Sequence, residues 1–307
     1  MLQSPMDVLK NFPVRRNRKQ KESFRESVRS NVTGLGYPCA VENGSFGSKN
    51  LVIGDPDSAR FLITAHYDTP ACMPFPNFIT PCNAVAYFAY QFGLVFGMLL
   101  LSVVPAAIAG ALLGDYHSAY FVWYFTYLGL LAFMMFGPAN PNNANDNTSG
   151  VVTLLSLAAA LPAEKRTGVC FVLFDLEEMG LIGSKSYRKA HRTATDRQIV
   201  LNMDCVGDGD TIMAFPTKKL NADQTGMALL QKLCYCEGHK KVTVHQKGFY
   251  VYPSDQKNFP YGVGIAAFKH GRHIGMFCDR IHTRRDTVLD ENNVNILRDR
   301  LLAVITG

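Results

Sequence analysis

Five acidic and imidazole side chains stand out because each ends an apolar run or lies in a small polar loop beside one. Carboxylates mixed with imidazoles suit zinc, or a related divalent ion such as cobalt or manganese. Five ligands are too many for one tetrahedral catalytic zinc, but they fit two ions that share one carboxylate. Two such ions do hydrolysis, because one lowers the pKa of a water molecule and both stabilise the charge that develops on attack. The five are His66 in ITAHYDTP, Asp146 in NANDNTSG, Glu178 in LFDLEEMG, Asp204 in LNMDCVG and His282 in RIHTRRDT.

The order and wording of these motifs resemble peptidase family M28, a family of di-zinc aminopeptidases. The family pattern runs His-x-Asp, then Asn-Asp-x-x-Ser-Gly, Glu-Glu, Asp and His-Thr, and all five parts occur here in that order. The resemblance implies that His66, Asp146 and Asp204 hold one zinc ion. It implies that Asp146, Glu178 and His282 hold the other, with Asp146 as the bridge.

Two further carboxylates take roles from the same resemblance. Glu177 matches the family's general base, and Asp68 matches the carboxylate that orients the first histidine. The residues themselves agree with this, because adjacent side chains such as Glu177 and Glu178 point in different directions. One of them can hold a metal while the other reaches the water that attacks the substrate.

Three apolar runs would deliver these groups to one place. RFLITAH ends at His66, TGVCFVLFDLEE ends at Glu178, and RQIVLNMD ends at Asp204. Each is rich in β-branched and apolar residues, which predicts strands. Ligands of open α/β sheets bind at the carboxyl ends of strands, so we expect the three ends to converge on one edge.

Each ligand also has a local alternative. His66 alone could be a core or capping histidine, and Asp204 could be a turn residue at a strand end. Asp146 lies before the apolar run VVTLLSLAAAL, where an aspartate often caps a helix. The co-occurrence of all five motifs favours metal binding.

Alternating strands and helices predict an α/β fold, a three-layer sandwich around a mixed, largely parallel sheet of the phosphorylase/hydrolase-like zinc peptidase type. We expect a catalytic domain formed by residues 1–82 and 138–307, interrupted by a hydrophobic helical hairpin at 83–137. The expected helices are 6–34, 148–161, 180–190, 220–237 and 290–305, and the expected strands are 37–43, 50–54, 60–66, 167–175, 197–204, 210–215, 241–246 and 263–268.

The inserted segment departs from the family. Residues 84–114 and 119–136 carry no charged side chain, and a polar DYHS turn joins them. Each run has about the 20 residues that span a bilayer core, so we expect two transmembrane helices. The alternative is a hairpin buried over the active site or in the interface of a homo-oligomer.

The composition narrows the class of protein and its location in the cell. The net charge of +6 is mild, and no nucleic-acid-binding motif occurs. The basic cluster at 15–21 is typical of a solvated helix face, although it could contact anionic lipid. The eight cysteines form no disulfide framework, and the first residues lack the apolar core of an export signal. We therefore expect an integral membrane protein whose catalytic domain lies on the cytoplasmic side.

The segment YPSDQKNF resembles the family's Ser-Asp-His pocket segment, with Gln256 in place of the histidine. By this likeness Ser254 and Asp255 line the substrate pocket. A nearby tyrosine, Tyr250 or Tyr252, would donate a hydrogen bond to the oxyanion.

The predicted function is a membrane-anchored metallo-aminopeptidase that binds two zinc ions and acts on peptides with a free N-terminus. One alternative is an acyltransferase of the same fold that resembles the glutaminyl cyclases and uses a single zinc. The other is a non-catalytic membrane scaffold.

Overall fold

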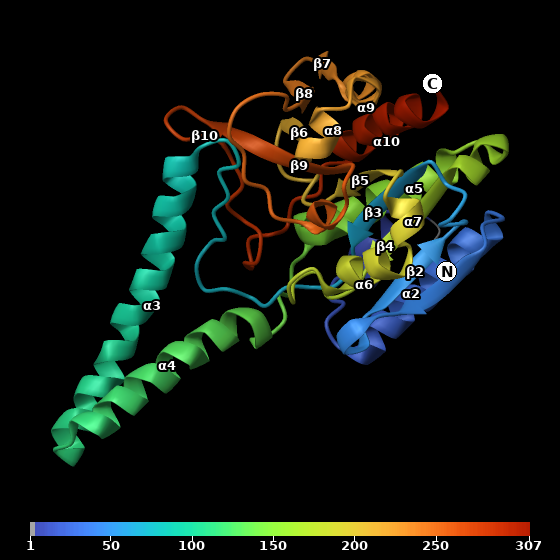
Figure 1. Cartoon of the computed structure of the whole chain (residues 1–307). Coiled ribbons are helices and arrows are strands. Elements are labelled where there is room, and N and C mark those ends of the chain that lie inside the picture. The colour runs from blue at the N-terminus through green and yellow to red at the C-terminus, as the bar shows by residue number, and fades with distance from the viewer. Residues whose placement is uncertain (1–3) are drawn as a thin grey trace.

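The computed structural model describes residues 4–307, and within them one ten-stranded sheet forms the centre of the molecule (Figure 1). The strands are β1 Cys39–Asn43, β2 Lys49–Ile53, β3 Phe61–His66, β4 Val169–Phe174, β5 Ile199–Met203, β6 Thr211–Pro216, β7 Tyr235–Glu237, β8 Lys240–Val244, β9 Gly262–Gly271 and β10 Gly275–Phe277. Their order is β1-β2-β4-β3-β5-β9-β6-β8-β7, and β10 pairs with β9.

The sheet is parallel at its centre and mixed toward its edges. Strands β4, β3, β5 and β9 run parallel to one another, whereas β1, β2 and β7 join by antiparallel pairing. The prediction of a mixed sheet in an α/β fold is confirmed. The parallel centre is the part that matters for the site, because its strands end at the same edge.

Helices cover both faces of the sheet. The α-helices are α1 Asp7–Asn11, α2 Arg18–Gly34, α3 Ala84–Leu113, α4 Tyr116–Phe136, α5 Gly150–Ala160, α6 Ile182–Ala190, α7 Arg192–Thr195, α8 Lys218–Asn221, α9 Gln224–Leu230 and α10 Glu291–Thr306. Short helical turns are η1 Ser45–Gly47, η2 Ala144–Ser149, η3 Ala163–Gly168, η4 Gln231–Leu233 and η5 Asp255–Asn258.

Strand β4 shows why the sheet needs cover on both sides. Successive side chains of a strand point to opposite faces. Phe171 and Leu173 pack in the large core with α2, α5 and α10, whereas Val172 and Phe174 pack on the other face with Tyr187 of α6. All six β4 residues are buried. A continuous apolar run is therefore the sequence pattern of a central strand.

The N-terminal region corrects one expectation. A single helix over 6–34 was predicted, but the chain forms α1 and α2 with a break between them. Pro13 lies in the break, and proline interrupts helical hydrogen bonding. Asn17 then begins α2 with a capping box, in which its side chain accepts from Gln20 N and the Gln20 side chain accepts from Asn17 N.

The segment after β6 corrects a second expectation about the helices. A helix over 220–237 was predicted, but α8, α9 and η4 replace it, and Tyr235–Glu237 form β7. Asp223 caps the start of α9 by accepting a hydrogen bond from Thr225 N. Gly238, with φ +58°, lies in the tight turn between β7 and β8. The strand β10 was not predicted.

The inserted segment forms a helical hairpin, α3 and α4. Gly114 ends α3 in the left-handed conformation, and Asp115 begins α4 by accepting hydrogen bonds from His117 N and Ser118 N. The turn is therefore shorter than the predicted DYHS. At about 1.5 Å per residue, the 30 residues of α3 and the 21 of α4 both reach about the 30 Å of a bilayer core.

The hairpin projects away from the rest of the chain, here called the catalytic body. Figure 1 shows α3 and α4 meeting at their far ends and separating toward the body as a V. In the most apolar part of α3 only 17% of residues are buried, and in that of α4 none are. The hairpin is therefore not a buried cover within the single chain. The division of the chain into a catalytic domain and an inserted hairpin at 83–137 stays a prediction. The predicted catalytic domain begins at residue 1, and residues 1–3 lie outside the described part of the chain.

Candidate metal centre

Three of the predicted ligand segments end neighbouring strands of the parallel centre. His66 is the last residue of β3, Asp204 directly follows β5, and Glu177 and Glu178 follow shortly after β4. Strand β3 pairs in parallel with both β4 and β5. The expected convergence of the three strand ends on one edge is confirmed.

The other two predicted ligands come from loops. Asp146 lies in η2, and His282 lies between β10 and α10. The Asp146 carboxylate stands between two imidazoles, with Oδ1 3.2 Å from His66 Nε2 and Oδ2 3.0 Å from His282 Nε2. Asp204 Oδ1 is 3.5 Å from His66 Nε2, and Glu178 Oε2 is 3.3 Å from His282 Nε2.

These distances define two groups of three that share Asp146. One is His66, Asp146 and Asp204, and the other is Asp146, Glu178 and His282. In each group the ligand atoms lie within 4.8 Å of one another. The structure thus brings together all five side chains that the sequence motifs predicted, in the two sets that the resemblance implied.

The electrostatics of the cluster fit divalent cations. Burial raises the pKa of Glu178 well above its usual value, and the Asp146 carboxylate adds to the rise. Glu178 Oε1 is buried without a hydrogen-bond partner among the described residues. Buried carboxylates without partners are costly unless they are paired or coordinate metals. The mixed imidazole and carboxylate donors are those that zinc accepts.

Asp68 connects the two sides of this centre. Its Oδ1 is 3.5 Å from His66 Nδ1, the ring nitrogen on the far side from Asp146. The same carboxylate accepts hydrogen bonds from Glu177 N at 3.0 Å and Glu178 N at 3.3 Å. It therefore fixes the Glu177-Glu178 backbone and lies beside the histidine ring.

Asp286 is a supporting residue that the motif search missed. Its carboxylate accepts hydrogen bonds from Asn145 N at 2.7 Å and Asp146 N at 2.9 Å. Burial raises the pKa of Asp286 to about 7, with the Asp146 carboxylate as a further cause. The residue lies in the HTRRDT motif with His282, so its nearness to a predicted ligand was an available signal.

The basic cluster at 15–21 is not only a solvated face, which corrects the sequence interpretation. Arg15 is fully buried, where its Nε donates to Tyr67 O at 2.5 Å and its Nη1 to Thr148 Oγ1 at 3.1 Å. Burial lowers the pKa of Arg15 to about 10. Lys21 Nζ is 2.5 Å from Asp175 Oδ1, directly after β4. The N-terminal segment therefore supports the loops that carry Asp68 and Asp146.

The four predicted substrate-binding residues have different surroundings. Tyr252 is buried beside the centre and donates its hydroxyl hydrogen to Asp204 O at 2.8 Å, whereas the Tyr250 hydroxyl donates to Pro216 O. Ser254 Oγ accepts from Asn202 Nδ2, and Asp255 accepts from Ser184 Oγ. Only Tyr252 of these four lines the cavity at the centre.

That cavity has a volume of about 390 Å³ and is here called the catalytic cavity. Its walls include the five predicted ligands and Glu177. They also include Tyr87 and Gln91 of α3 and Met135 of α4. The feet of the hairpin, which the sequence predicts to cross a membrane or to cover the active site, thus line part of the cavity.

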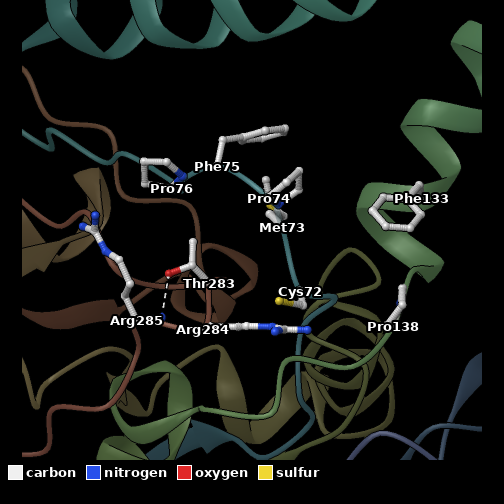
Figure 2. A pocket seen from close by; sticks show the side chains of 10 residues that line it. All are labelled: Cys72, Met73, Pro74, Phe75, Pro76, Phe133, Pro138, Thr283, Arg284 and Arg285. Carbon is white, nitrogen blue, oxygen red and sulfur yellow. Dashed lines mark hydrogen bonds between the residues drawn. The ribbon is translucent and has the colours of Figure 1, made fainter.

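A second hollow, of about 570 Å³, lies at the foot of α4 and contains none of the predicted ligands (Figure 2). Figure 2 shows Arg284 extending across it, with Phe133 of α4 on one side. Arg285 N donates to Thr283 Oγ1 at 3.1 Å within this loop. The loop directly follows His282, so the foot of the hairpin lies against a segment that carries a predicted ligand.

Comparison with known proteins identifies the family to which the chain belongs. The sequence model of peptidase family M28 matches residues 132–304, more than half of the chain. The chain therefore belongs to peptidase family M28 and is a metal-dependent peptidase. A search of curated proteins finds no significant match.

Solved structures share the fold across almost the whole chain. The LapA aminopeptidase of Legionella pneumophila is 14% identical, with a TM-score of 0.56, and the match covers 98% of this chain and 66% of LapA. A Zn-dependent exopeptidase from Parabacteroides distasonis is 15% identical, with a TM-score of 0.60 over 98% of this chain and 96% of that one. The glutaminyl cyclase of Porphyromonas gingivalis is 16% identical, with a TM-score of 0.57 over 98% and 96%. At these identities the likeness shows the fold.

Proposed function

We propose that the protein is a membrane-anchored aminopeptidase that removes the N-terminal residue of peptides with the help of two zinc ions. The observation that carries this proposal is the Asp146 carboxylate, whose two oxygens face His66 and His282 in two separate groups of candidate ligands. A carboxylate with one oxygen toward each group suits a ligand shared by two ions.

The residues divide into two sets. His66, Asp146 and Asp204 would hold one zinc, and Asp146, Glu178 and His282 the other. When bound, the two ions would supply Lewis-acid chemistry, which makes water a better nucleophile near neutral pH and stabilises negative charge on the substrate carbonyl.

Glu177 is the proposed general base and acid. A carboxylate oxygen of Glu177 lies within 4.8 Å of candidate ligand atoms of His66 and Glu178, and this closeness supports the role of a base for a water molecule bound there. It would take the proton of the attacking water and pass it to the departing amine. Asp68 accepts a hydrogen bond from Glu177 N at 3.0 Å and so holds the backbone that carries this carboxylate.

The hairpin is the proposed membrane anchor. Residues of α3 and α4 carry no charge and are mostly exposed, and an apolar surface of this extent is unfavourable in water. A hairpin places both of its flanking segments on one side of the membrane. We propose that this side is cytoplasmic, because the catalytic body carries the Lys and Arg residues and its cysteines are unpaired.

The function is tested by elemental analysis of the purified protein and a scan of aminoacyl reporters and peptides. The proposal expects two zinc ions per chain and release of the free N-terminal amino acid. A single zinc and release of pyroglutamyl peptide from an N-terminal glutamine would support a glutaminyl cyclase instead. Full metal loading without turnover of any substrate would favour the non-catalytic scaffold.

The anchor is tested by washing membranes with alkaline carbonate and by labelling a Ser118→Cys variant in intact cells with an impermeant thiol reagent. Retention in the membrane and labelling at position 118 are expected. Cys234 and Cys236 are exposed on the catalytic body and serve as internal markers for the opposite side. Labelling of these two in intact cells would reverse the orientation, and release into the wash would exclude the anchor.

A further inference from the structure

The catalytic cavity has two chemically different sides. One side carries the candidate ligands and Glu177, so it is rich in carboxylates. Another part of its lining comes from the feet of the hairpin, through Tyr87, Gln91 and Met135. Tyr87 and Gln91 lie outside the 132–304 segment that matches the peptidase family. They belong to the part of the chain that is inserted, and so can give this protein a preference of its own.

Tyr87 and Gln91 share one face of α3, because residues four apart in a helix are neighbours. Neither the Tyr87 hydroxyl nor the Gln91 amide makes a hydrogen bond within residues 4–307, and both line the catalytic cavity. Gln91 is the sole amide side chain between Asn83 and Asn140. Both side chains are only partly buried, so their polar groups are free to hydrogen-bond a ligand in the cavity.

The foot of α3 is held in place from several directions. Asn83 caps the helix by accepting a hydrogen bond from Ala86 N at 3.0 Å, and its Nδ2 donates to Ile274 O at 3.3 Å. The Tyr90 hydroxyl donates to Pro76 O in the preceding loop. Tyr87 and Gln91 are thus presented to the cavity by a fixed helix end, which lowers the entropy cost of binding a ligand there.

We propose that the first two turns of α3 form a substrate-binding element, in which Tyr87 and Gln91 hydrogen-bond the main chain of a peptide beyond its first residue. This inference rests on the proposed aminopeptidase function. The N-terminal ammonium group is a cation and is attracted to the carboxylate side, where the first carbonyl must also react. The following residues would then lie along the part of the cavity lining that the hairpin supplies.

An amide both donates and accepts hydrogen bonds, as a peptide main chain does. Gln91 can therefore hydrogen-bond the main chain of a peptide whatever its side chains are. Met135 of α4 is flexible and apolar, and supplies a surface for apolar side chains of varied shape. The accepted class is then a peptide of three or more residues whose second and third residues are apolar. An aminoacyl reporter that ends at the scissile bond would not reach this wall.

The test compares leucine para-nitroanilide with the tetrapeptide amide Leu-Ala-Leu-Ala in purified protein in detergent. For Gln91→Leu and Tyr87→Phe, KM for the tetrapeptide should rise by about three- to tenfold, which is the size of one lost hydrogen bond. Its kcat should stay within about twofold, and both constants for the nitroanilide should be unchanged. Gln91→Asn should recover part of the loss, because the amide is retained.

Two variants serve as matched controls. Phe92→Ala and Phe136→Ala remove large side chains that are 71% and 63% exposed on the same helices, beside Gln91 and Met135 but outside the catalytic cavity. Both should leave the two substrates unaffected. Zinc content is measured for every variant, so that loss of folding is recognised. Tyr87→Phe removes only one hydroxyl and keeps the ring in place.

Binding supplies a readout that does not need turnover. Calorimetric titration of the tetrapeptide into a Glu177→Gln background should show the same weakening when Gln91→Leu or Tyr87→Phe is added. If neither variant changes tetrapeptide binding or KM, or if the nitroanilide is affected equally, the substrate-binding element is wrong while the aminopeptidase function stands. If the metal-loaded wild type cleaves neither substrate, the proposed function fails, and the calorimetric comparison still decides the role of α3.

Discussion

Replacing Asp286 by asparagine tests whether the loop that carries Asp146 is held in place for metal binding. The Asp286 carboxylate accepts backbone hydrogen bonds from Asn145 at 2.7 Å and Asp146 at 2.9 Å. Asparagine has nearly the same shape but only one acceptor oxygen. One of the two backbone N–H groups would therefore face an NH2 donor and lose its partner.

The size of the effect follows from these contacts. A hydrogen bond to a charged acceptor contributes about 1.5–3 kcal/mol, and a buried donor left alone costs about as much again. Part of this is relieved by movement of the loop, which displaces the Asp146 carboxylate. Loss of a residue that orients a metal ligand typically weakens metal affinity by about 10- to 100-fold. That range corresponds to about 1.4–2.7 kcal/mol and so agrees with one lost charged hydrogen bond.

The assay is zinc titration of metal-free protein against a competing chelator, with thermal unfolding of the same samples. Both zinc affinities should fall in Asp286→Asn, because Asp146 belongs to both candidate sites. Asp279→Asn is the matched control. Its carboxylate lies in the same loop but pairs with Lys269 and Arg285 at 2.9 Å near the surface, where ion pairs contribute about 0–1 kcal/mol. Unchanged zinc affinity in the folded Asp286→Asn protein would refute the reasoning.

Three further predictions follow from the site and its support. Glu177→Gln should lower kcat by at least about 100-fold, a typical contribution of a general base, while two zinc ions stay bound; near-normal turnover would remove Glu177 from the mechanism. Asp146→Ala should deplete both zinc ions and His282→Ala chiefly one, as elemental analysis would show; two ions retained without Asp146 would exclude it as the bridge. Arg15→Met should destabilise the protein by about 1–3 kcal/mol in chemical denaturation, because it leaves the Tyr67 carbonyl without its donor; the exposed Lys19→Met should change stability little, and an equal effect of the two would contradict a buried supporting role for Arg15.

The sequence predicted the part of the site that depends on local pattern. His66, Glu178 and Asp204 end apolar runs, and those runs are the buried central strands β3, β4 and β5. Neighbouring parallel strands end at a common edge of the sheet. The sequence pattern alone was therefore enough to predict that these three side chains lie close together. The same holds for the hairpin, whose two uncharged runs fix the approximate length of each helix.

The parts of the site that the sequence did not predict depend on contacts between segments that are far apart in the chain. Asp286 acts through the backbone of residues that are 140 and 141 positions earlier, and Arg15 through a carbonyl 52 positions later. No periodicity or composition carries that information. The two uncharged runs also do not show where the helix ends lie relative to the site in the folded chain. The presence of Gln91 in the catalytic cavity was therefore not predicted. By contrast, the break between α1 and α2 has a local signal in the sequence, because Pro13 cannot continue a helix.

The position of the hairpin within the chain has a consequence for how the protein is made. His66 precedes the hairpin, whereas Asp146, Glu178, Asp204 and His282 all follow it. Synthesis proceeds from the N-terminus, so both apolar helices are translated before any of these four residues, and His282 follows the end of α4 by more than a hundred residues. In a chain that inserts as proposed, both helices can reach the membrane while the metal site still lacks His282. A site that needs His282 is then completed after the anchor has been made, so the proposed activity would begin at the bilayer.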